Sequence, residues 1–165
     1  MDKNNKVLVF ENVWEKQVFE QQEIKTIWKQ FNPDMDETMV GERLRQIVWL
    51  VKNEFDQVVA LSTAYPVFVK QLRLYMYAVR LLIIPGYRIP GLMSKLLVDT
   101  RDFLEARRPE GEAHRPQGII TLVENERLKR MRNEAIWPAS HMVYIGNSKK
   151  GHHIYVYYFK GALID

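Results

Sequence analysis

Hydrophobic residues in the first half of the chain follow two spacings, one typical of helices and one typical of strands. The helical spacing begins at Val13 and stops at Asn32-Pro33, because proline ends a helix. A second, shorter helix is expected to end near Leu44, with Asp34 or Asp36 as its N-cap. Compact apolar runs predict strands at residues 7–10, 47–51, 58–65 and 74–84.

Strands and helices alternate in the second half as well. Pro66 is expected to break or kink the third strand. A helix that buries Leu92, Leu96 and Leu97 follows the fourth strand and stops before Arg108-Pro109. The remaining pattern predicts a strand at 118–123, a short helix at 125–133, and a hairpin of strands 142–145 and 154–159. Neither a repeat nor a linker divides the chain, so we expect one domain over residues 1–165 of mixed α/β (α+β) class.

The composition limits the kinds of catalytic and metal-binding site that the chain can form. The chain of 165 residues has no cysteine, which excludes disulfides, thiol catalysis and cysteine-based zinc sites. His152 and His153 are adjacent, so in a strand they point to opposite faces, and we expect no metal site. No apolar run has the length of a signal peptide core or a membrane span, which leads us to expect a cytoplasmic protein without a membrane partner.

The net charge of +4 is mild and fits either solubility or attraction to an anionic ligand. A denser basic cluster comprises Arg127, Lys129, Arg130 and Arg132. Such a cluster is more often a solvated helix face than a nucleic-acid site, so we do not expect nucleic acid as a partner.

The segment LLIIPGYRIPGLMSKLL, residues 81–97, combines an apolar strand, a short Pro/Gly turn and an amphipathic helix. A helix start leaves several N–H groups without partners and carries a positive partial charge, so it is a natural place for phosphate. Gly91 lets the backbone approach a ligand, and Arg88 adds a charged fork. These features predict a pyrophosphate site.

Residues Pro85 to Met93 resemble the acyl-CoA loop of the GNAT superfamily of N-acetyltransferases, whose pattern is R/Q-x-x-G-x-G/A. Arg88 and Gly91 match the first two fixed positions, whereas Met93 replaces the final small residue and Pro90 is unusual inside the loop. The order of elements also resembles that of the GNAT fold over essentially the whole chain. The resemblance implies a mixed, mostly antiparallel sheet of about seven strands with helices on both faces.

The resemblance further implies acetyl-CoA as cosubstrate. The backbone of Leu81, Leu82 and Ile83 would bind pantetheine, although a simple buried strand would look the same. The pyrophosphate would lie against Arg88, Ile89, Pro90, Gly91, Leu92, Met93 and Ser94. Asn125 stands where many members carry a CoA-contacting asparagine. The alternatives are that Arg88 is a surface arginine and that Ser94 and Asn125 are helix caps.

The tyrosine that protonates the departing thiolate in many members is replaced here by Arg132. Tyr144 is a candidate substitute, and Glu124 is the acidic candidate for the base that takes the amine proton, with His141 as second choice. A packed aromatic and a solvated strand-end glutamate are the alternatives for Tyr144 and Glu124.

Taken together, the residues and the resemblance predict an acetyl-CoA-dependent N-acyltransferase. It would transfer acetyl to a primary amine, a small molecule or peptide, by direct attack in a ternary complex. The alternative is a catalytically degenerate GNAT-fold module that binds acyl-CoA or another protein. An exposed edge of the terminal hairpin could also pair with a second copy in a homodimer.

Overall fold

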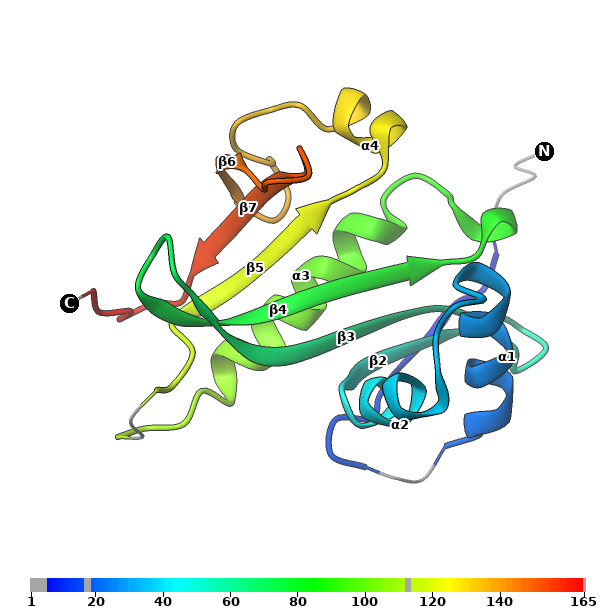
Figure 1. Cartoon of the computed structure of the whole chain (residues 1–165). Coiled ribbons are helices and arrows are strands. Elements are labelled where there is room, and N and C mark those ends of the chain that lie inside the picture. The colour runs from blue at the N-terminus through cyan, green and yellow to red at the C-terminus, as the bar shows by residue number, and fades with distance from the viewer. Residues whose placement is uncertain (1–5, 17–18, 112–113, 165) are drawn as a thin grey trace. The chain divides into compact units, whose positions relative to one another are not determined.

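The computed structural model describes residues 6–16, 19–111 and 114–164, and these contain four α-helices, one 3-10 helix and seven strands (Figure 1). The helices are α1 (Gln21–Phe31), α2 (Glu37–Arg45), η1 (Pro85–Tyr87), α3 (Leu92–Ala106) and α4 (Glu126–Met131). The strands are β1 (Val9–Asn12), β2 (Ile47–Lys52), β3 (Val58–Val69), β4 (Leu74–Ile83), β5 (Gly118–Val123), β6 (Val143–Asn147) and β7 (His153–Tyr158).

All seven strands belong to one sheet, in the order β1-β2-β3-β4-β5-β7-β6. The pairs β1–β2, β2–β3, β5–β7 and β6–β7 are antiparallel, whereas β4 and β5 run parallel. The α3 helix lies between the two parallel strands in sequence, as a crossover between parallel strands requires. The prediction of a mixed, mostly antiparallel sheet of about seven strands is confirmed.

The chain divides into two compact units, and each is described by itself. Unit 1 comprises Met1–Thr63 and Leu81–Leu96, and unit 2 comprises Ala64–Arg80 and Leu97–Asp165. The division runs through β3, β4 and α3, so neither unit is one continuous stretch of sequence.

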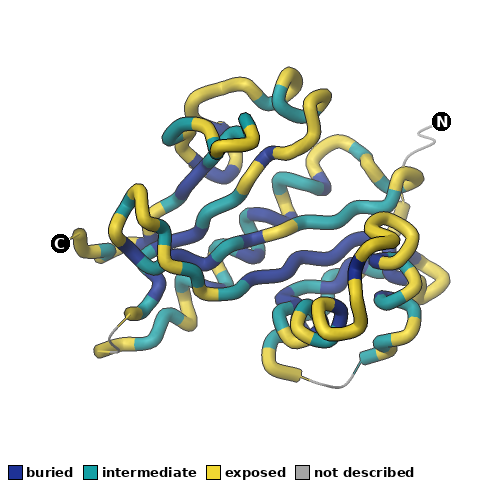
Figure 2. The backbone as a smooth tube through the Cα atoms, in the orientation of Figure 1, coloured by how far each residue is buried: buried dark blue, intermediate teal, exposed yellow. Residues whose placement is uncertain are grey.

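Unit 1 has a hydrophobic cluster on each face of its strands. On one face, α1 and α2 contribute buried Ile24, Trp28 and Leu44, which pack with Leu50 and other strand residues. The opposite face packs the start of α3, through Leu92 and Leu96, on Val51, Val59 and Ala60. The strands between the two clusters are therefore buried on both sides, as the dark segments of β2 and β3 in Figure 2 show.

In unit 2 the strands pack so closely at one point that only glycine fits. A Cβ added to Gly118 would lie 2.0 Å from the carbonyl oxygen of Tyr157 and 2.9 Å from Cε of Met76. The backbone of β7 therefore occupies the space that a side chain would need. Gly118 pairs with Tyr158 in the β5–β7 ladder, which runs without a break to Val123 and His153.

Two predicted boundaries near the N-terminus are wrong. The first strand is Val9–Asn12 rather than residues 7–10, because its ladder with β2 begins at the pair Val9–Lys52. The first helix starts at Gln21 rather than near Val13. The N–H of Val13 still donates to the carbonyl of Val48, so this residue is tied to the sheet. Val18, part of the predicted helical pattern, lies outside the described residues.

Other boundaries are settled by local contacts. The cap of α2 is Asp36 rather than Asp34, since its side chain accepts a hydrogen bond from Met39 N–H at 2.8 Å. Pro66 does not break its strand, and β3 continues to Val69. The ladder of β3 with β2 reaches only Thr63, so Pro66 lies beyond it, where a missing donor costs least.

No helix among the described residues is long and apolar enough to cross a membrane. In the same residues no group of three or more histidine, aspartate or glutamate side chains is placed to hold a metal ion.

Candidate functional site

The loop that follows β4 is held at its base by contacts within unit 1. The N–H of Ile84 donates to the carbonyl of Val59 at 3.0 Å, and the turn Pro85–Tyr87 closes when Tyr87 N–H donates to Ile84 at 2.9 Å. The Tyr87 hydroxyl accepts a hydrogen bond from Nδ2 of Asn53 at 2.9 Å. The turn between β2 and β3, which contains Asn53, therefore fixes the direction in which the loop enters α3.

At the start of α3 the backbone is shaped by Gly91. Its φ is +83°, a conformation that side chains with a Cβ rarely adopt, although a Cβ here would meet no atom within 4 Å. The carbonyl of Gly91 accepts the first helical hydrogen bond, from Lys95 N–H at 2.9 Å. Among the described residues, no protein group accepts from the N–H of Gly91 or Met93. Two backbone donors are thus available to a ligand.

Three cationic side chains surround this loop. The ammonium of Lys6 lies 4.1 Å from the centre of the Tyr87 ring and donates to the carbonyl of Gly86. Lys95 lies over the ring of Phe10 at 4.5 Å. Arg88 is exposed and donates from Nε to the Ile83 carbonyl at 3.2 Å. The first turn of α3 contains no acidic residue. The loop is therefore a site of positive potential.

The end of β4 presents alternate backbone groups to opposite edges. The N–H of Ile84 points to β3. Because backbone groups alternate along a strand, the N–H and C=O groups of Leu82 also point toward β3. Those of Leu81 and Ile83 therefore lie on the edge away from β3. The side chains alternate too: Leu82 packs with the α1–α2 cluster, and Leu81 and Ile83 pack with the α3 cluster. Only Leu81 and Ile83 thus expose main-chain groups on the outer edge.

The parallel ladder between β4 and β5 is short in unit 2. It contains the pairs Tyr77–Ile119 and Ala78–Ile120, and directly after it the hydroxyl of Thr121 donates to the Val79 carbonyl at 3.1 Å. At this point the carbonyl group of β4 therefore accepts its hydrogen bond from a side chain of β5 and not from a backbone amide. This substitution marks where the regular pairing of the two strands stops.

Three predicted site residues, Glu124, Asn125 and Tyr144, belong to unit 2, whereas the loop residues belong to unit 1. Glu124 is exposed after β5. The side chain of Asn125 accepts from Leu128 N–H at 3.0 Å and caps α4, which confirms the helix-cap alternative. The hydroxyl of Tyr144 donates to Oδ1 of Asn147 at 2.9 Å, on a side chain that is 39% exposed.

The hydroxyl of a buried tyrosine, Tyr155, lies beside the backbone of Arg132. The hydroxyl of Tyr155 lies 3.1 Å from the carbonyl oxygen of Arg132 and 3.0 Å from that of Glu134. Burial raises the pKa of this hydroxyl. Trp137 stacks on the ring at 4.2 Å. Tyr155 therefore fastens the segment after α4 to the sheet, and it is too enclosed to exchange protons with a ligand.

The outer edge of the terminal hairpin is partly occupied. Tyr144 N–H donates to the Ala135 carbonyl at 2.8 Å, and Ile136 forms a β-bridge with Val143. The start of β6 is thus already paired on its outer side. This corrects the expectation that this part of the edge is free for a second copy.

Sequence reasoning missed Lys6, Lys95 and the support of Tyr87 by Asn53. Lys6 and Gly86 are 80 residues apart, so no local pattern connects them. Lys95 was recognisable only as a charged residue of an amphipathic helix.

Comparison with known proteins gives matches in structure alone. No protein-family profile matches the chain, and no curated protein sequence matches it. An acetyltransferase of the GNAT family from Streptococcus pneumoniae has 12% identity and a TM-score of 0.57, over 91% of this chain and 96% of that one. The ribosomal-protein-S5-alanine acetyltransferase of Vibrio fischeri has 11% identity and a TM-score of 0.62, over 94% and 95%. The toxin AtaT, bound to the C-terminus of the antitoxin AtaR and to acetyl-CoA, has 11% identity and a TM-score of 0.59, over 94% and 95%.

These matches span nearly the whole of each protein. The chain has the fold of the GNAT acetyltransferases, as the resemblance in its sequence implied.

Proposed function

We propose that this protein binds acetyl-CoA at the loop of residues 88–94 and transfers the acetyl group to a primary amine. The observation that carries the proposal is the start of α3, where Gly91 adopts a φ of +83° and the N–H groups of Gly91 and Met93 have no acceptor among the described residues. Backbone donors of this kind, with the positive end of a 15-residue helix behind them, suit a pyrophosphate.

The side chains around the loop support the same ligand. Lys6, Arg88 and Lys95 supply positive charge without a competing acid in the first turn. Pantetheine would add to the outer edge of β4 through the main chain of Leu81 and Ile83, as an extended peptide adds to a sheet. Leu82 has its main chain toward β3, so its part in the predicted pantetheine site is limited to packing.

The reaction that fits this arrangement is direct acyl transfer in a ternary complex. The lone pair of a neutral amine attacks the thioester carbonyl carbon, the carbon–sulfur bond breaks, and the amine proton leaves to a base while the thiolate takes up a proton. The N–H of Ile83 is the donor proposed for the carbonyl oxygen. Glu124 as the base and Tyr144 as the acid stay predictions.

A second candidate function is an acyl-CoA-binding or protein-interaction module without turnover. Two observations favour it: Arg132 occupies the position of the family's tyrosine, and the Tyr144 proton is already donated to Asn147 at 2.9 Å. The enzyme and the acyl-CoA-binding form of the module both require the loop to bind CoA, and they differ only in whether the thioester is consumed. The protein-interaction form does not require CoA.

Calorimetry with acetyl-CoA and with CoA tests the shared requirement. We expect both to bind the wild type and neither to bind Gly91→Trp, whose side chain would be forced into a strained backbone conformation in front of the free N–H groups. An absence of binding to the wild type would end the proposals of an enzyme and of an acyl-CoA-binding module, and would leave the protein-interaction module. Release of free thiol in the presence of polyamines, amino acids or peptide N-termini then separates the enzyme from the module.

A further inference from the structure

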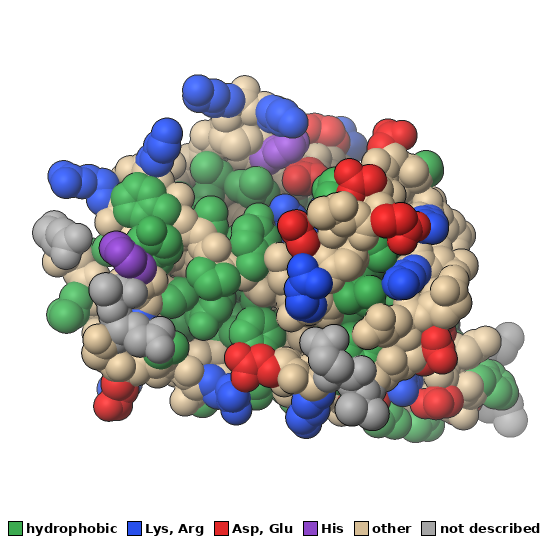
Figure 3. Space-filling model, turned by 60° about the horizontal axis from the view of Figure 1, so that its bottom comes forward, with side chains coloured by type: hydrophobic (Ala, Val, Ile, Leu, Met, Phe, Trp, Pro, Cys, Tyr) green, Lys and Arg blue, Asp and Glu red, His purple; other side chains and the backbone are tan. Residues whose placement is uncertain are grey.

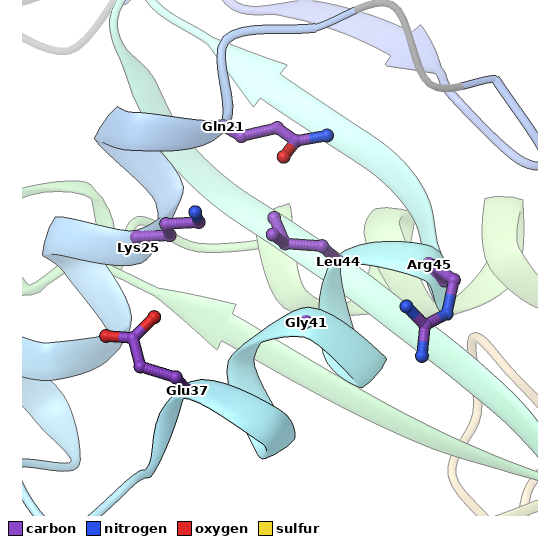
Figure 4. Close-up of a pocket in the computed structure, with 6 residues that line it drawn as sticks. All are labelled: Gln21, Lys25, Glu37, Gly41, Leu44 and Arg45. Carbon is purple, nitrogen blue, oxygen red and sulfur yellow. The ribbon is translucent and has the colours of Figure 1, made fainter.

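Unit 1 contains a hollow between α1 and α2, well apart in sequence from the loop of residues 88–94. It encloses about 220 Å³ and lies open to solvent (Figure 4). Its lining residues are Gln21, Lys25, Glu37, Gly41, Leu44 and Arg45. The floor is Leu44, which belongs to the hydrophobic cluster of α1 and α2, whereas the loop residues Tyr87 and Ile89 pack with the other cluster of unit 1.

The hollow exists because a glycine occupies the middle of α2. A Cβ on Gly41 would meet no atom within 4 Å, and the residue is not among the glycines of positive φ. Neither close packing nor backbone conformation therefore requires glycine there. Glycine is among the least favourable residues for a helix interior. The missing side chain has one structural consequence, which is to keep the space between the helices open.

The charges around the hollow are arranged unequally. Lys25 on α1 and Arg45 on α2 line it from two sides, and the charge of Lys25 contributes to the lowered pKa of Glu37. Glu37, in contrast, is held by Lys29 at 2.9 Å. That hydrogen bond is the main cause of the lowered pKa of Glu37. On the face that Figure 3 shows, acidic and basic side chains are mixed at the right of the view, whereas basic side chains gather at its upper left. The hollow thus has two cations and one acid, and the charge of that acid is compensated mainly by Lys29.

We propose that the hollow between α1 and α2 is a binding site for a small organic anion, whose carboxylate or phosphate group is held by Lys25 and Arg45. The volume is below the roughly 300–1,000 Å³ of pockets that enclose drug-sized ligands, which favours a compact molecule. Gln21 provides an amide that can donate to a second oxygen. Because the hollow and the loop pack on different clusters of unit 1, this site does not depend on the function proposed above.

Titration of the ¹⁵N-labelled full chain with glutarate, and separately with inorganic phosphate, tests the site. We expect saturable chemical-shift changes at millimolar ligand, confined to the residues that line the hollow. Preference for glutarate assigns a carboxylate ligand, and preference for phosphate assigns a phosphorylated one. Changes that are absent, or that spread over charged residues everywhere without saturating, would overturn the proposal.

Five variants of the lining residues have stated expected affinities. Gly41→Gln fills the hollow and should abolish binding, whereas Gly41→Ala adds only a methyl group and should retain most of it. Lys25→Gln and Arg45→Gln should each weaken binding about tenfold, as expected for a lost charge-assisted hydrogen bond. The change Glu37→Gln removes the acid on the rim and should strengthen binding.

Matched controls lie on the same helix outside the hollow. Glu42→Gln removes an acid and Arg43→Gln removes a cation, and neither residue lines the site. If these controls change the affinity as much as Glu37→Gln and Arg45→Gln do, only the general charge of α2 matters and the site is refuted. Thermal melting of each variant checks the fold. Should Gly41→Gln not fold, the opposite effects of Arg45→Gln and Glu37→Gln still decide the question.

Discussion

Helices α3 and α4 each follow a strand of the same sheet, but their first turns are built in opposite ways. At α4, Asn125 caps the Leu128 N–H through its side chain, and Glu126 places an acid in the first turn. At α3, the residue before the helix is Gly91, which has no side chain to act as a cap, and no acid occupies the first turn. The chain thus satisfies the start of α4 itself, whereas the N–H groups of Gly91 and Met93 at the start of α3 have no acceptor among the described residues.

The difference between the two helix starts also explains the charges nearby. Around α4, Lys129 is used within the protein, since it donates to Glu126 at 3.0 Å and to the Gly151 carbonyl at 2.9 Å. Around α3, Lys6 and Lys95 contact aromatic rings, and Lys6 also donates to a backbone carbonyl. The first turn of α3 contains no acid, whereas the first turn of α4 contains Glu126, which pairs with Lys129.

Of the changes considered, a side chain placed at the start of α3 should have the largest effect, which is a loss of affinity for CoA. Gly91→Asp and Gly91→Asn both place a side chain that tolerates positive φ better than most at this position. The aspartate would cap the free N–H groups and repel phosphate, so we expect CoA affinity to fall by about 100-fold, and by about tenfold for the uncharged asparagine. Calorimetry measures both. Equal, wild-type affinity in the two variants would show that the loop holds no phosphate.

Removal of the cap at the start of α4 should lower the stability of the fold and leave the affinity for CoA unchanged. Asn125→Ala removes the cap, and we expect the free energy of unfolding to fall by about 1 kcal/mol. Asn125→Asp keeps an oxygen acceptor for Leu128 N–H and should stay near the wild type. Urea denaturation measures the difference. If Asn125→Ala lowers CoA affinity without changing stability, the predicted CoA contact outweighs the cap.

A smaller effect is expected at Met93, the residue that departs from the family's loop pattern. Met93→Ala shortens a half-buried side chain beside an N–H that has no acceptor, so the ligand can approach more closely. We expect CoA to bind about threefold more tightly, a change of less than 1 kcal/mol. Met131→Ala, at an exposed methionine of α4, is the matched control and should leave the affinity unchanged. Weaker binding by Met93→Ala would mean that Met93 itself contacts the ligand.

Much of the difference between the starts of α3 and α4 could be predicted from the sequence, because it depends on residues close to each helix. Strand 118–123 was predicted to the residue, since its apolar run is bounded by a glycine and by a polar pair. Gly91 and Asn125 stand directly at their helices, where turn and cap preferences act over a few residues. The candidate loop was found for the same reason.

What the sequence did not reveal depends on distant contacts. The helical spacing that begins at Val13 is misleading because Val13 donates to Val48 and belongs to the sheet. Asn53 supports Tyr87 across 34 positions, and nothing near either residue indicates the bond. The hollow beside Gly41 requires two helices to pack, so the glycine alone gave no sign of it.

The smallest expected effect is a pH dependence at the start of α4, which the start of α3 should not show because its first turn has no acid. Hydrogen bonding to Lys129 is the main cause of the lowered pKa of Glu126, and the charge of Lys129 adds to it. A carboxyl whose pKa is lower in the folded state stabilises the fold above its unfolded value, near 4.5, and this contribution is lost as the pH falls through the folded value. Glu126 is fully exposed, so the change in stability should be slight. Carboxyl ¹³C titration should give Glu126 a pKa below 4.5 that returns toward 4.5 in Lys129→Ala. An unchanged pKa in Lys129→Ala would assign the shift to the helix start itself, and the contrast with α3 would then rest on the cap alone.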